Sequence, residues 1–422
     1  MTVDPREQDW LRLDNAAKIY PSSFSARSPD VFRLSVRLTA PVRVSALDQA
    51  LRRVLPRCPY FQVYLRRGFF WYYLQRNDAV PALEPLGDEP VAAIPIRKRD
   101  SHLLRVRARE RTIAIDFSHV LTDGGGGLRF LGTLTVEYLR LCGVPVSGWE
   151  PFLDPDASPT AEESEDAHNR FFGGRRPKPL RRSPAYQIAD GRRADFRVIT
   201  GRMSVARVLD GARKHAASLT EYLVAVYMHS LAEVRRAEGR RSRSIVRLEV
   251  PVNMRQFHPS QTMRNFSLYV SPEIDLALGE YSFAEMVARV HHSMRIEVDA
   301  RELNRQLARN VGAERNPLIR VAPLPVKDLV LSIARRRLAE RVYSGVLSNL
   351  GKVSVPESID AHVESFGFAI VPSLRMKKNC AILSFRDDLQ IAIGSVIESR
   401  ELERRFFSAL VREGVSVKVG EC

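Results

Sequence analysis

The chain has 422 residues, of which 45% are hydrophobic and 27% charged, and its formal net charge is +16. Single hydrophobic cores stop growing at roughly 250–300 residues, so this length predicts two core-bearing domains. No apolar run reaches the ~18–20 residues that cross a bilayer, and the first ten residues lack the apolar segment of a secretory signal. We therefore expect a globular, cytoplasmic protein with no integral membrane segment.

The cysteines and the basic charge narrow the classes of ligand. We expect no metal site and no disulfide framework, because no C-x-x-C spacing or nearby histidine accompanies Cys58, Cys142, Cys380 and Cys422. The 65 lysines and arginines, against 49 acidic residues, attract polyanions. Nucleic acid, an anionic membrane surface and a phosphate-bearing cofactor all fit that charge. The basic runs are scattered, without the interleaved aromatic residues of a nucleic-acid module, so nucleic-acid binding is disfavoured.

Hydrophobic periodicity predicts mixed strands and helices along the first half of the chain. Ser45 is the predicted N-cap of a helix over residues 46–55, and Pro56 is expected to end it. An aromatic run at residues 69–73 could line an acyl pocket, but sheet core is the favoured interpretation. The predicted strands of this half are residues 32–38, 61–65, 69–74, 103–108 and 112–117.

A second α/β half follows a segment rich in proline, glycine and charge at residues 150–185, which indicates a linker or crossover loop. Thr220 is expected to cap a helix that ends at Arg236. Residues 282–309 predict one long basic amphipathic helix, which favours a packed surface helix over a membrane contact. Further helices are expected at 204–215, 327–341 and 398–412, and strands at 245–252, 266–274, 344–351, 362–371, 380–385 and 389–396.

These elements divide the chain into three expected parts. They are an N-terminal subdomain over residues 1–155, a linker over 156–185 and a C-terminal subdomain over 186–422. The predicted fold class is therefore α/β with mixed sheets, in two domains.

One short motif, Ser118 to Gly124, carries the chemistry that the sequence offers. His119 follows a predicted strand, Asp123 comes four residues later, and Gly124 opens a run of four glycines. A histidine at a strand end, in a loop that glycine makes flexible, could act as a general base in a cleft, because imidazole titrates near neutral pH. The glycines would let the backbone approach a ligand, and the next helix could offer its N-terminal N–H groups to an anion. The alternative is an ordinary strand end followed by an Asp-Gly turn.

In this layout the H-x-x-x-D-G motif resembles the signature of the chloramphenicol acetyltransferase-like superfamily, which includes BAHD acyltransferases and peptide-synthetase condensation domains. The chain is more closely similar to the bacterial family of alcohol acetyltransferases. That likeness rests on four stretches in the expected order: residues 13–21, residues 118–124, residues 250–255 with 263–266, and residues 347–351. The resemblance implies a two-domain fold with the active site at the domain interface.

Three departures refine this resemblance. Condensation domains usually carry a second histidine where this chain has Ser118, and BAHD enzymes usually carry D-F-G-W-G where it has Ser365-Phe366-Gly367-Phe368-Ala369. No carrier-protein or adenylation segment accompanies the motif. These departures favour a stand-alone bacterial acyltransferase.

The resemblance also implies a division of roles. His119 would deprotonate an alcohol or amine as it attacks a thioester, with no covalent enzyme intermediate. Asp123 would point away from His119 and pair with an arginine, for which Arg255 is the candidate; the alternative is a solvated Arg255 at a strand end. Asn265 would bond backbone near the cleft, and Ser348 beside Asn349 would line it, Ser348 as an oxyanion donor.

Acyl-CoA is the expected co-substrate, with no permanently bound cofactor and no metal. Its phosphates would meet arginines or lysines, with Arg264, Arg375, Lys377 and Lys378 as weak suggestions. An acidic acyl carrier protein as donor remains open, and so does a catalytically silent binding protein. The acceptor, the acyl length and the oligomeric state stay open as well.

Overall fold

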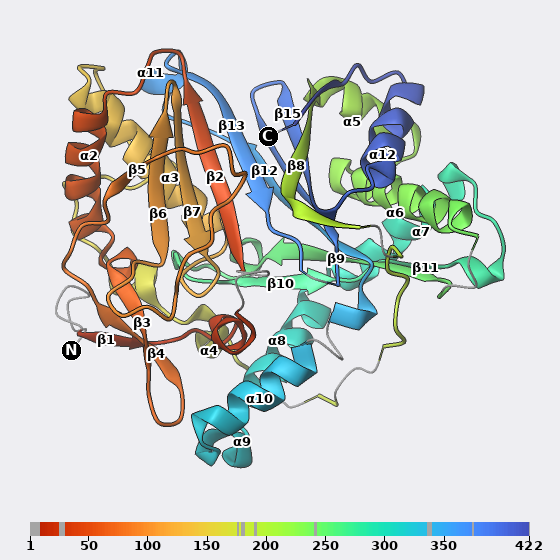
Figure 1. Cartoon of the computed structure of the whole chain (residues 1–422), viewed down its shortest axis with the longest axis horizontal. Coiled ribbons are helices and arrows are strands. Elements are labelled where there is room, and N and C mark those ends of the chain that lie inside the picture. Colours follow the sequence, from red (N-terminus) through yellow and green to blue (C-terminus); the bar gives the residue numbers. More distant parts are fainter. Residues whose placement is uncertain are drawn as a thin grey trace.

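The computed structural model describes residues 9–24, 30–174, 177–178, 182–189, 192–239, 243–335, 340–373 and 375–421. Cys422 lies outside these ranges, and so do parts of the scattered basic runs: Arg175, Arg176, Arg240, Arg241, Arg336 and Arg337. The described part forms two α/β halves that lie side by side, the first in red to yellow and the second in green to blue (Figure 1). No helix in it is long and apolar enough to cross a bilayer.

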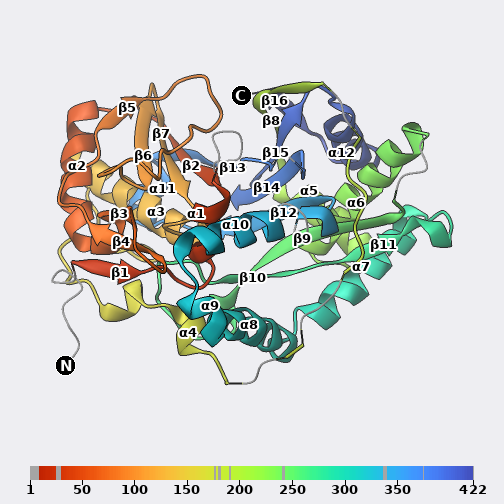
Figure 2. The same ribbon diagram turned by 60° about the horizontal axis from the view of Figure 1, so that its bottom comes forward.

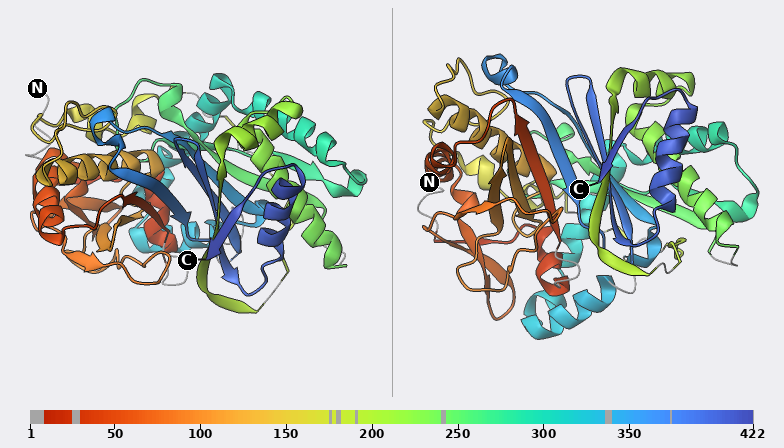
Figure 3. Two further views of the ribbon diagram at one scale, coloured as in Figure 1. Left: turned by 90° about the horizontal axis from the view of Figure 1, so that it is seen from above. Right: turned by 45° about the horizontal axis from the view of Figure 1, so that its top comes forward.

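The first half is built on a five-stranded sheet in the order β13-β2-β7-β6-β5. Its pairs are antiparallel except β5 with β6, which is parallel. The strands are β2 (Val31–Leu38), β5 (Leu83–Pro85), β6 (Leu104–Arg109), β7 (Thr112–Ser118) and β13 (Val363–Ile370). Strand β13 comes from the far end of the chain, and Figure 3 shows this blue strand beside the red β2.

Helices α2 (Val44–Arg57) and α3 (Gly124–Leu141) pack together against this sheet. A smaller sheet, in the order β1-β4-β3, adjoins it. Its strands are β1 (Trp10–Arg12), β3 (Val63–Arg67) and β4 (Tyr72–Arg76), and the short helices nearby are η2 (Ala17–Ile19), α1 (Tyr20–Ser23) and η3 (Pro59–Phe61). A continuous core of buried side chains joins these layers, with Phe117 and Phe130 at its centre.

The second half is built on a mixed sheet in the order β10-β9-β12-β14-β15-β8-β16, with β11 also paired to β9. Strand β12 runs parallel to both its neighbours, and the remaining pairs are antiparallel. The strands are β8 (Arg193–Ser204), β9 (Ile245–Asn253), β10 (Ser267–Val270), β11 (Glu273–Asp275), β12 (Gly345–Val353), β14 (Lys378–Phe385), β15 (Asp388–Ile397) and β16 (Lys418–Glu421).

Two groups of helices accompany this second sheet. One group packs on the sheet and buries a second core: α5 (Val205–Lys214), α6 (Leu219–Ala237), α7 (Phe283–Glu297) and α12 (Glu401–Arg412). The other is α8 (Ala300–Glu314), α9 (Pro317–Val321) and α10 (Leu324–Ala334). Figure 2 shows α10 running across the boundary between the halves, with α8 and α9 beside it. Short turns complete the fold: η4 (Ala161–Ser164), α4 (Ala167–Arg170), η5 (Met254–Gln256), η6 (Leu276–Leu278), η8 (Glu340–Val342) and α11 (Glu357–Asp360).

The segment expected to be a linker is packed against both halves. Its Glu163 forms a buried, two-pronged ion pair with Arg57 of α2, at 2.6 and 2.8 Å. The backbone N–H of Met263 in the second half donates to the carbonyl of Glu163 at 2.8 Å. The proposed division at residues 155 and 186 stays a prediction, and the exchange of β13 shows that the two sheets do not follow it strictly.

Several helix boundaries differ from the sequence prediction; for example, α10 spans Leu324–Ala334, where a helix over 327–341 was expected. Helix α2 begins at Val44, with Arg43 rather than Ser45 at its N-cap, and it holds Pro56 in its last turn. Helix α6 is capped by Ser218, because Ser218 and Glu221 satisfy each other's backbone N–H groups in a capping box. The long helix at 282–309 is two helices, since Asp299 caps α8 by accepting the N–H of Arg301.

The prediction that the aromatic run at residues 69–73 is sheet core is wrong for its first part. Phe69 and Phe70 lie in the β3–β4 loop with 72% and 44% of their surface exposed. The loop closes through a hydrogen bond from the Gly68 N–H to the Trp71 carbonyl at 3.1 Å. Only from Tyr72, where β4 begins, do the side chains enter the sheet.

Candidate active site

A cavity of about 1040 Å³ lies between the two halves. It is lined by β2, β13, α3 and the turn after β7 in the first half, by β9, β10 and β12 of the second sheet, and by α8 to α10. All seven residues singled out from the sequence line it: His119, Asp123, Gly124, Arg255, Asn265, Ser348 and Asn349. The sequence-predicted residues therefore converge on one cleft, although they come from four separate stretches.

Strand β7 and the turn after it hold His119 at the cleft. The backbone N–H of His119 donates to the carbonyl of Asp30 at 3.0 Å. The hydroxyl of Ser118 accepts the N–H of Val120 at 3.2 Å, which fixes the turn immediately after the strand. Ser118, which stands where condensation domains carry a second histidine, therefore shapes the turn in this chain.

The imidazole of His119 lies among aromatic rings. The Tyr20 ring stacks on it at 5.3 Å, and the Phe32 ring lies 4.7 Å away. Its Nδ1 is buried, with no hydrogen-bond partner within the described residues. Burial lowers the pKa of His119, and the carboxylates of Asp30 and Asp123 offset only part of this effect. The ring is thus neutral near pH 7, as a base that must accept a proton requires.

Asp123 is fully occupied by partners other than His119. Its carboxylate accepts from the Arg255 guanidinium at 2.9 and 3.2 Å, from the Phe266 N–H at 2.8 Å and from the Gly126 N–H at 2.9 Å. Burial alone would raise the pKa of Asp123, but Arg255 and the two backbone N–H groups outweigh it and hold the pKa below its usual value. The ion pair implied by the resemblance is present, and it joins the two halves of the molecule.

The glycine run forms the first turn of α3, and its first two residues, Gly124 and Gly125, line the cleft. Asp123 caps the helix, so its side chain already occupies the N-terminus that we expected to be offered to an anion. A Cβ on Gly126 would lie 2.1 Å from the Met263 carbonyl oxygen of the second half. Beside it, the Thr122 hydroxyl donates to that same carbonyl at 2.6 Å. Glycine is needed here so that the two halves can approach each other.

Asn265 connects the histidine loop to the N-terminal segment. Its amide nitrogen donates to the His119 carbonyl and to the Asp14 carboxylate, both at 3.1 Å. Its neighbour Arg264 is buried and lies over the Tyr60 ring, whose hydroxyl donates to the Leu121 carbonyl at 2.7 Å. The motif loop is therefore held in place by the segment that begins at Met263.

Ser348 and Asn349 lie on β12, on the opposite wall of the cleft. Asn349 is committed to its neighbours: its amide nitrogen donates to Thr220 at 2.9 Å, and its oxygen accepts the Gly351 N–H at 2.8 Å. Thr220, which we expected to cap α6, therefore supports β12 instead. The Ser348 hydroxyl has no hydrogen bond to another described residue, so it is available to a ligand.

Sequence reasoning missed the residues on the α10 side of the cleft. Asp30, at a positive φ of 50°, forms a two-pronged ion pair with Arg335 at the end of α10, one contact being 2.7 Å long. Arg335 also lies over Tyr20, on which His119 stacks. Burial raises the pKa of the cleft carboxyl Glu249 to about 7. A lone aspartate and a lone arginine 305 residues apart give no sequence signal that could have paired them.

His168 is a further cleft residue that the sequence did not single out. It lies on α4, in the segment taken as a linker, and its side chain is fully buried with its ring edge-on to Phe266 at 5.2 Å. Neither ring nitrogen has a hydrogen-bond partner within the described residues.

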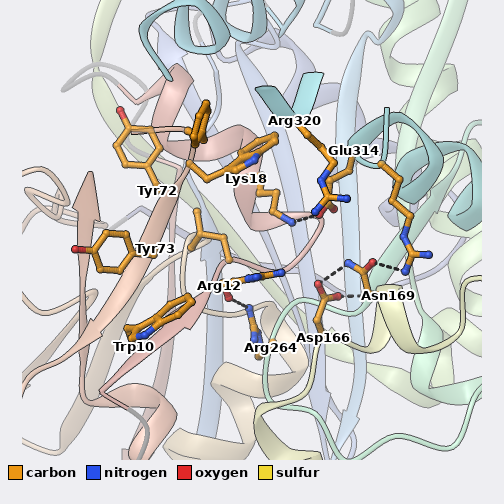
Figure 4. Close-up of a pocket in the computed structure, with 14 residues that line it drawn as sticks. Trp10, Arg12, Lys18, Tyr72, Tyr73, Asp166, Asn169, Arg264, Glu314 and Arg320 are labelled. Carbon is orange, nitrogen blue, oxygen red and sulfur yellow. Dashed lines mark hydrogen bonds and ion pairs between the residues drawn. The ribbon is translucent and has the colours of Figure 1, made fainter. Parts of the chain in front are cut away.

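A second cavity, of about 1110 Å³, is shown in Figure 4. It adjoins the cleft and shares Lys18, Trp71 and Glu314 with it. We call it the vestibule. Lys18 and Glu314 form an ion pair between the halves at the shared wall. The vestibule is basic and aromatic: it contains Arg12, Lys18, Arg264, Arg315 and Arg320, two acids (Asp166 and Glu314), and the rings of Trp10, Phe70, Trp71, Tyr72 and Tyr73.

Within the vestibule, Arg12 and Arg320 differ from the other basic residues. Their guanidinium groups make no hydrogen bond or ion pair with another described residue, whereas Arg315 bonds Asn169 and Arg264 bonds backbone carbonyls. Of the basic residues suggested from the sequence, only Arg264 lies here. Lys378 is instead buried in an ion pair with Glu403.

No family profile and no curated protein sequence matches the chain. Solved structures do match it over nearly its whole length. Polyketide synthase associated protein 5 from Mycobacterium tuberculosis has a TM-score of 0.62 at 14% identity, covering 95% of this chain and 96% of that one. The condensation domain from Monacolin K polyketide synthase MokA has a TM-score of 0.57 at 14% identity, covering 96% of both chains. The wax ester synthase/diacylglycerol acyltransferase from Marinobacter aquaeolei VT8 has a TM-score of 0.57 at 13% identity, covering 96% of this chain and all of that one.

The chain therefore has the two-domain chloramphenicol acetyltransferase-like fold, with mixed α/β sheets and the cleft between them. At these identities the likeness establishes the fold alone. The narrower resemblance to bacterial alcohol acetyltransferases stays a prediction.

Proposed function

We propose that the protein is an acyltransferase that moves an acyl group from a thioester to an alcohol or amine, with His119 as the general base. The observation that carries this proposal is a neutral, half-buried imidazole in an inter-sheet cleft, held by a loop whose aspartate is paired with Arg255. The fold supports it, because the similar structures include a condensation domain and an acyltransferase.

The proposed reaction has two proton transfers. His119 takes the proton of the acceptor hydroxyl or amine as its oxygen or nitrogen attacks the thioester carbonyl. The tetrahedral oxyanion then collapses, the carbon–sulfur bond breaks, and His119 returns the proton to the thiolate. The Ser348 hydroxyl lines the cleft and has no hydrogen-bond partner among the described residues, and we propose it as the donor to the oxyanion. Asp123 acts only by holding the loop.

The vestibule suggests that the donor carries phosphates. Arg12 and Arg320 are available guanidinium groups beside aromatic rings, a combination that suits phosphate groups and a flat base. Acyl-CoA is our first candidate, as a co-substrate and not a resident cofactor, and its use would place the reaction in the cytoplasm. A phosphopantetheine arm on an acidic acyl carrier protein offers the same thioester and phosphate chemistry.

A thiol-release assay tests the proposal. The protein is incubated with acetyl-CoA or longer acyl-CoAs and a panel of alcohols and amines, and then with acyl carrier protein in place of CoA. We expect release that His119→Ala reduces by about 10²–10⁴-fold. His292→Ala, which removes an exposed histidine of α7, is the matched control and should leave the rate unchanged. If neither donor gives release that depends on His119, the chain is a silent binding protein and the proposal is wrong.

Two further variants test the vestibule. Arg12→Gln and Arg320→Gln should raise the KM for the thioester with little change in kcat, because they remove binding and not chemistry. Arg301→Gln, an exposed arginine of α8 outside both cavities, is the control. A fall in kcat without a change in KM would contradict this placement of the donor.

A further inference from the structure

Exposed apolar side chains gather on α9 and α10. Leu318 and Leu329 have 78% and 63% of their surface exposed, and the same two helices expose Ile319, Val321, Val326, Val330 and Ile333. Most exposed apolar residues of a soluble surface are scattered singly, so this concentration needs an explanation.

The surface continues onto the first half of the molecule. The β3–β4 loop lies against the start of α10, since the Leu324 N–H donates to the Phe69 carbonyl at 2.9 Å and Lys327 donates to the Phe70 carbonyl at 2.8 Å. Both phenylalanine rings of that loop are exposed. We define the apolar rim as Phe69, Phe70, Leu318, Val321, Val326, Leu329, Val330 and Ile333.

The apolar rim surrounds the α10 side of the cleft. Leu318, Val326 and Val330 are exposed on the surface and also line the cavity that contains His119. Phe70 lines the vestibule in the same way. The route from the surface to the histidine therefore begins among apolar side chains.

The charge around the rim is basic. Residues 299–335 contain seven basic side chains (Arg301, Arg305, Arg309, Arg315, Arg320, Lys327 and Arg335) and four acidic ones (Asp299, Glu302, Glu314 and Asp328). Among the acids, Glu314 bonds Asn15 and Lys18, and Asp328 accepts from Ser22 and Tyr72. Among the cations, Lys327 is buried and Arg335 pairs with Asp30. Arg315 and Arg320 are exposed. An apolar surface flanked by cations matches an anionic lipid bilayer, which attracts the cations and receives the apolar side chains.

We propose that the apolar rim docks the protein on an anionic membrane surface without spanning it, so that the mouth of the cleft faces the lipid. The charge complementarity favours this occupant over an apolar protein partner or a second copy of the chain. The proposal goes beyond acyl transfer, because docking concerns a surface whose outermost residues take no part in the chemistry.

Vesicle flotation tests it. The full chain is mixed with vesicles of phosphatidylcholine alone or with added phosphatidylglycerol. We expect it to float with the anionic vesicles and to lose most of that binding at high salt, which screens the attraction. A triple variant, Phe69→Ser with Val321→Ser and Leu329→Ser, should reduce the bound fraction at least about tenfold, since each change removes an exposed side chain that would enter the bilayer.

The matched control is Leu278→Ser with Val411→Ser and Val419→Ser, which removes three exposed apolar side chains from η6, α12 and β16. It should bind vesicles like the unmodified protein. None of the six residues lines either cavity, so both triple variants should turn over short soluble substrates at the unmodified rate. Failure of acyl transfer would thus appear separately from failure of docking.

Four results would overturn the proposal. The first three are no flotation with anionic vesicles, equal flotation with neutral vesicles, and equal loss of binding in the rim and control variants. The fourth is a protein that does not bind vesicles but forms a dimer in light scattering, which only the rim variant abolishes. The last result would assign the rim to contact between copies of the chain.

Discussion

Two aspartate–arginine pairs join the halves of the molecule at the cleft, and they are built differently. Asp123 and Arg255 sit in a dense network: besides each other, Asp123 accepts two backbone N–H groups, and Arg255 donates to the carbonyls of Thr262 and Arg264 at 2.9 and 2.6 Å. Asp30 and Arg335 also form two contacts, but Arg335 stands at the end of α10, whose outer face belongs to the apolar rim.

We call the side of the cleft held by Asp123 and Arg255 the fixed wall, and the side formed by α10 the adjustable wall. The histidine loop is anchored by backbone groups on both sides, so the base keeps its position relative to the second sheet. The Asp30–Arg335 pair holds α10, a helix with exposed apolar residues along one side. Segments with few buried apolar contacts open locally at a low cost in free energy. The proposed base therefore lies on the more firmly held side of the cleft, and α10 forms the other side.

Breaking the first pair should have the largest effect on stability. Asp123→Asn leaves Arg255 without its buried counter-charge, so we expect the free energy of unfolding to fall by about 3–5 kcal/mol, with activity lost alongside. Denaturant unfolding measures it. The control, Asp360→Asn, removes an exposed carboxylate that also pairs with an arginine, Arg386, and should cost at most about 1 kcal/mol. Equal losses in the two variants would remove the distinction between the pairs.

Gly126→Ala should be the next most damaging change to the fixed wall. The added Cβ meets the Met263 carbonyl, which belongs to backbone and cannot rotate away, so the halves must separate slightly. We expect a loss of about 1–3 kcal/mol in unfolding free energy. Gly148→Ala, where a Cβ meets nothing within 4 Å, is the control and should be near neutral. A fully stable Gly126→Ala protein would show that the contact is looser than described.

The second pair should respond locally. Asp30→Asn removes one partner of Arg335, but the Glu340 carboxylate remains 3.5 Å from the guanidinium, so we expect a smaller loss of about 1–2 kcal/mol. Hydrogen exchange should accelerate in α10 and stay unchanged at residues 118–126. Faster exchange in the histidine loop instead would mean that the two walls move together.

The pH dependence of activity reports on the fixed wall. Because burial lowers the pKa of His119 from its usual 6.5, the base stays neutral at pH 7 and becomes protonated only at lower pH. We expect kcat/KM for the thioester to fall on an acid limb centred below pH 6.5. A midpoint above pH 6.5 would contradict this, because it would mean that the imidazole is more hydrated or closer to negative charge than the cleft makes it.

A further prediction concerns the pH dependence of stability through Glu249. Its pKa is raised by burial from 4.5 to about 7, so the folded protein binds its proton more tightly than the unfolded chain does. This contribution to stability is complete below pH 4.5 and is lost as pH rises toward 7. Glu249→Gln should therefore gain melting temperature relative to the unmodified protein across that interval. A constant difference between the two proteins would show that the carboxyl titrates normally.

The sequence was sufficient for the parts of the site that lie in compact motifs. The order of four stretches implied the fold, and it placed His119, Arg255 and Asn265 in one cleft, where the structure also finds them. That inference rested on the resemblance to a known superfamily, whose motifs these stretches match in order. The catalytic roles of these residues remain predictions.

The sequence could not predict features set by tertiary contact. Phe69 and Phe70 have a strand-like pattern, yet the loop binds the backbone of α10 and leaves their rings outside. Strand β8 was missed because arginines, an aspartate and a glycine interrupt its alternation, and only the pairing with β15 along most of its length stabilises it. Thr220 and Ser218 are equally plausible caps by residue type, and Glu221 decides between them.

The exchange of β13 into the first sheet has a consequence for how the chain is made. Strand β2 receives its outer neighbour only from residues 363–370, so during synthesis its edge is unpaired until nearly nine-tenths of the chain has emerged. An unpaired edge invites pairing with another chain. The first half therefore cannot complete its sheet as an independent unit. A fragment ending near residue 155 is expected to aggregate, and adding a peptide of residues 358–373 should restore its solubility.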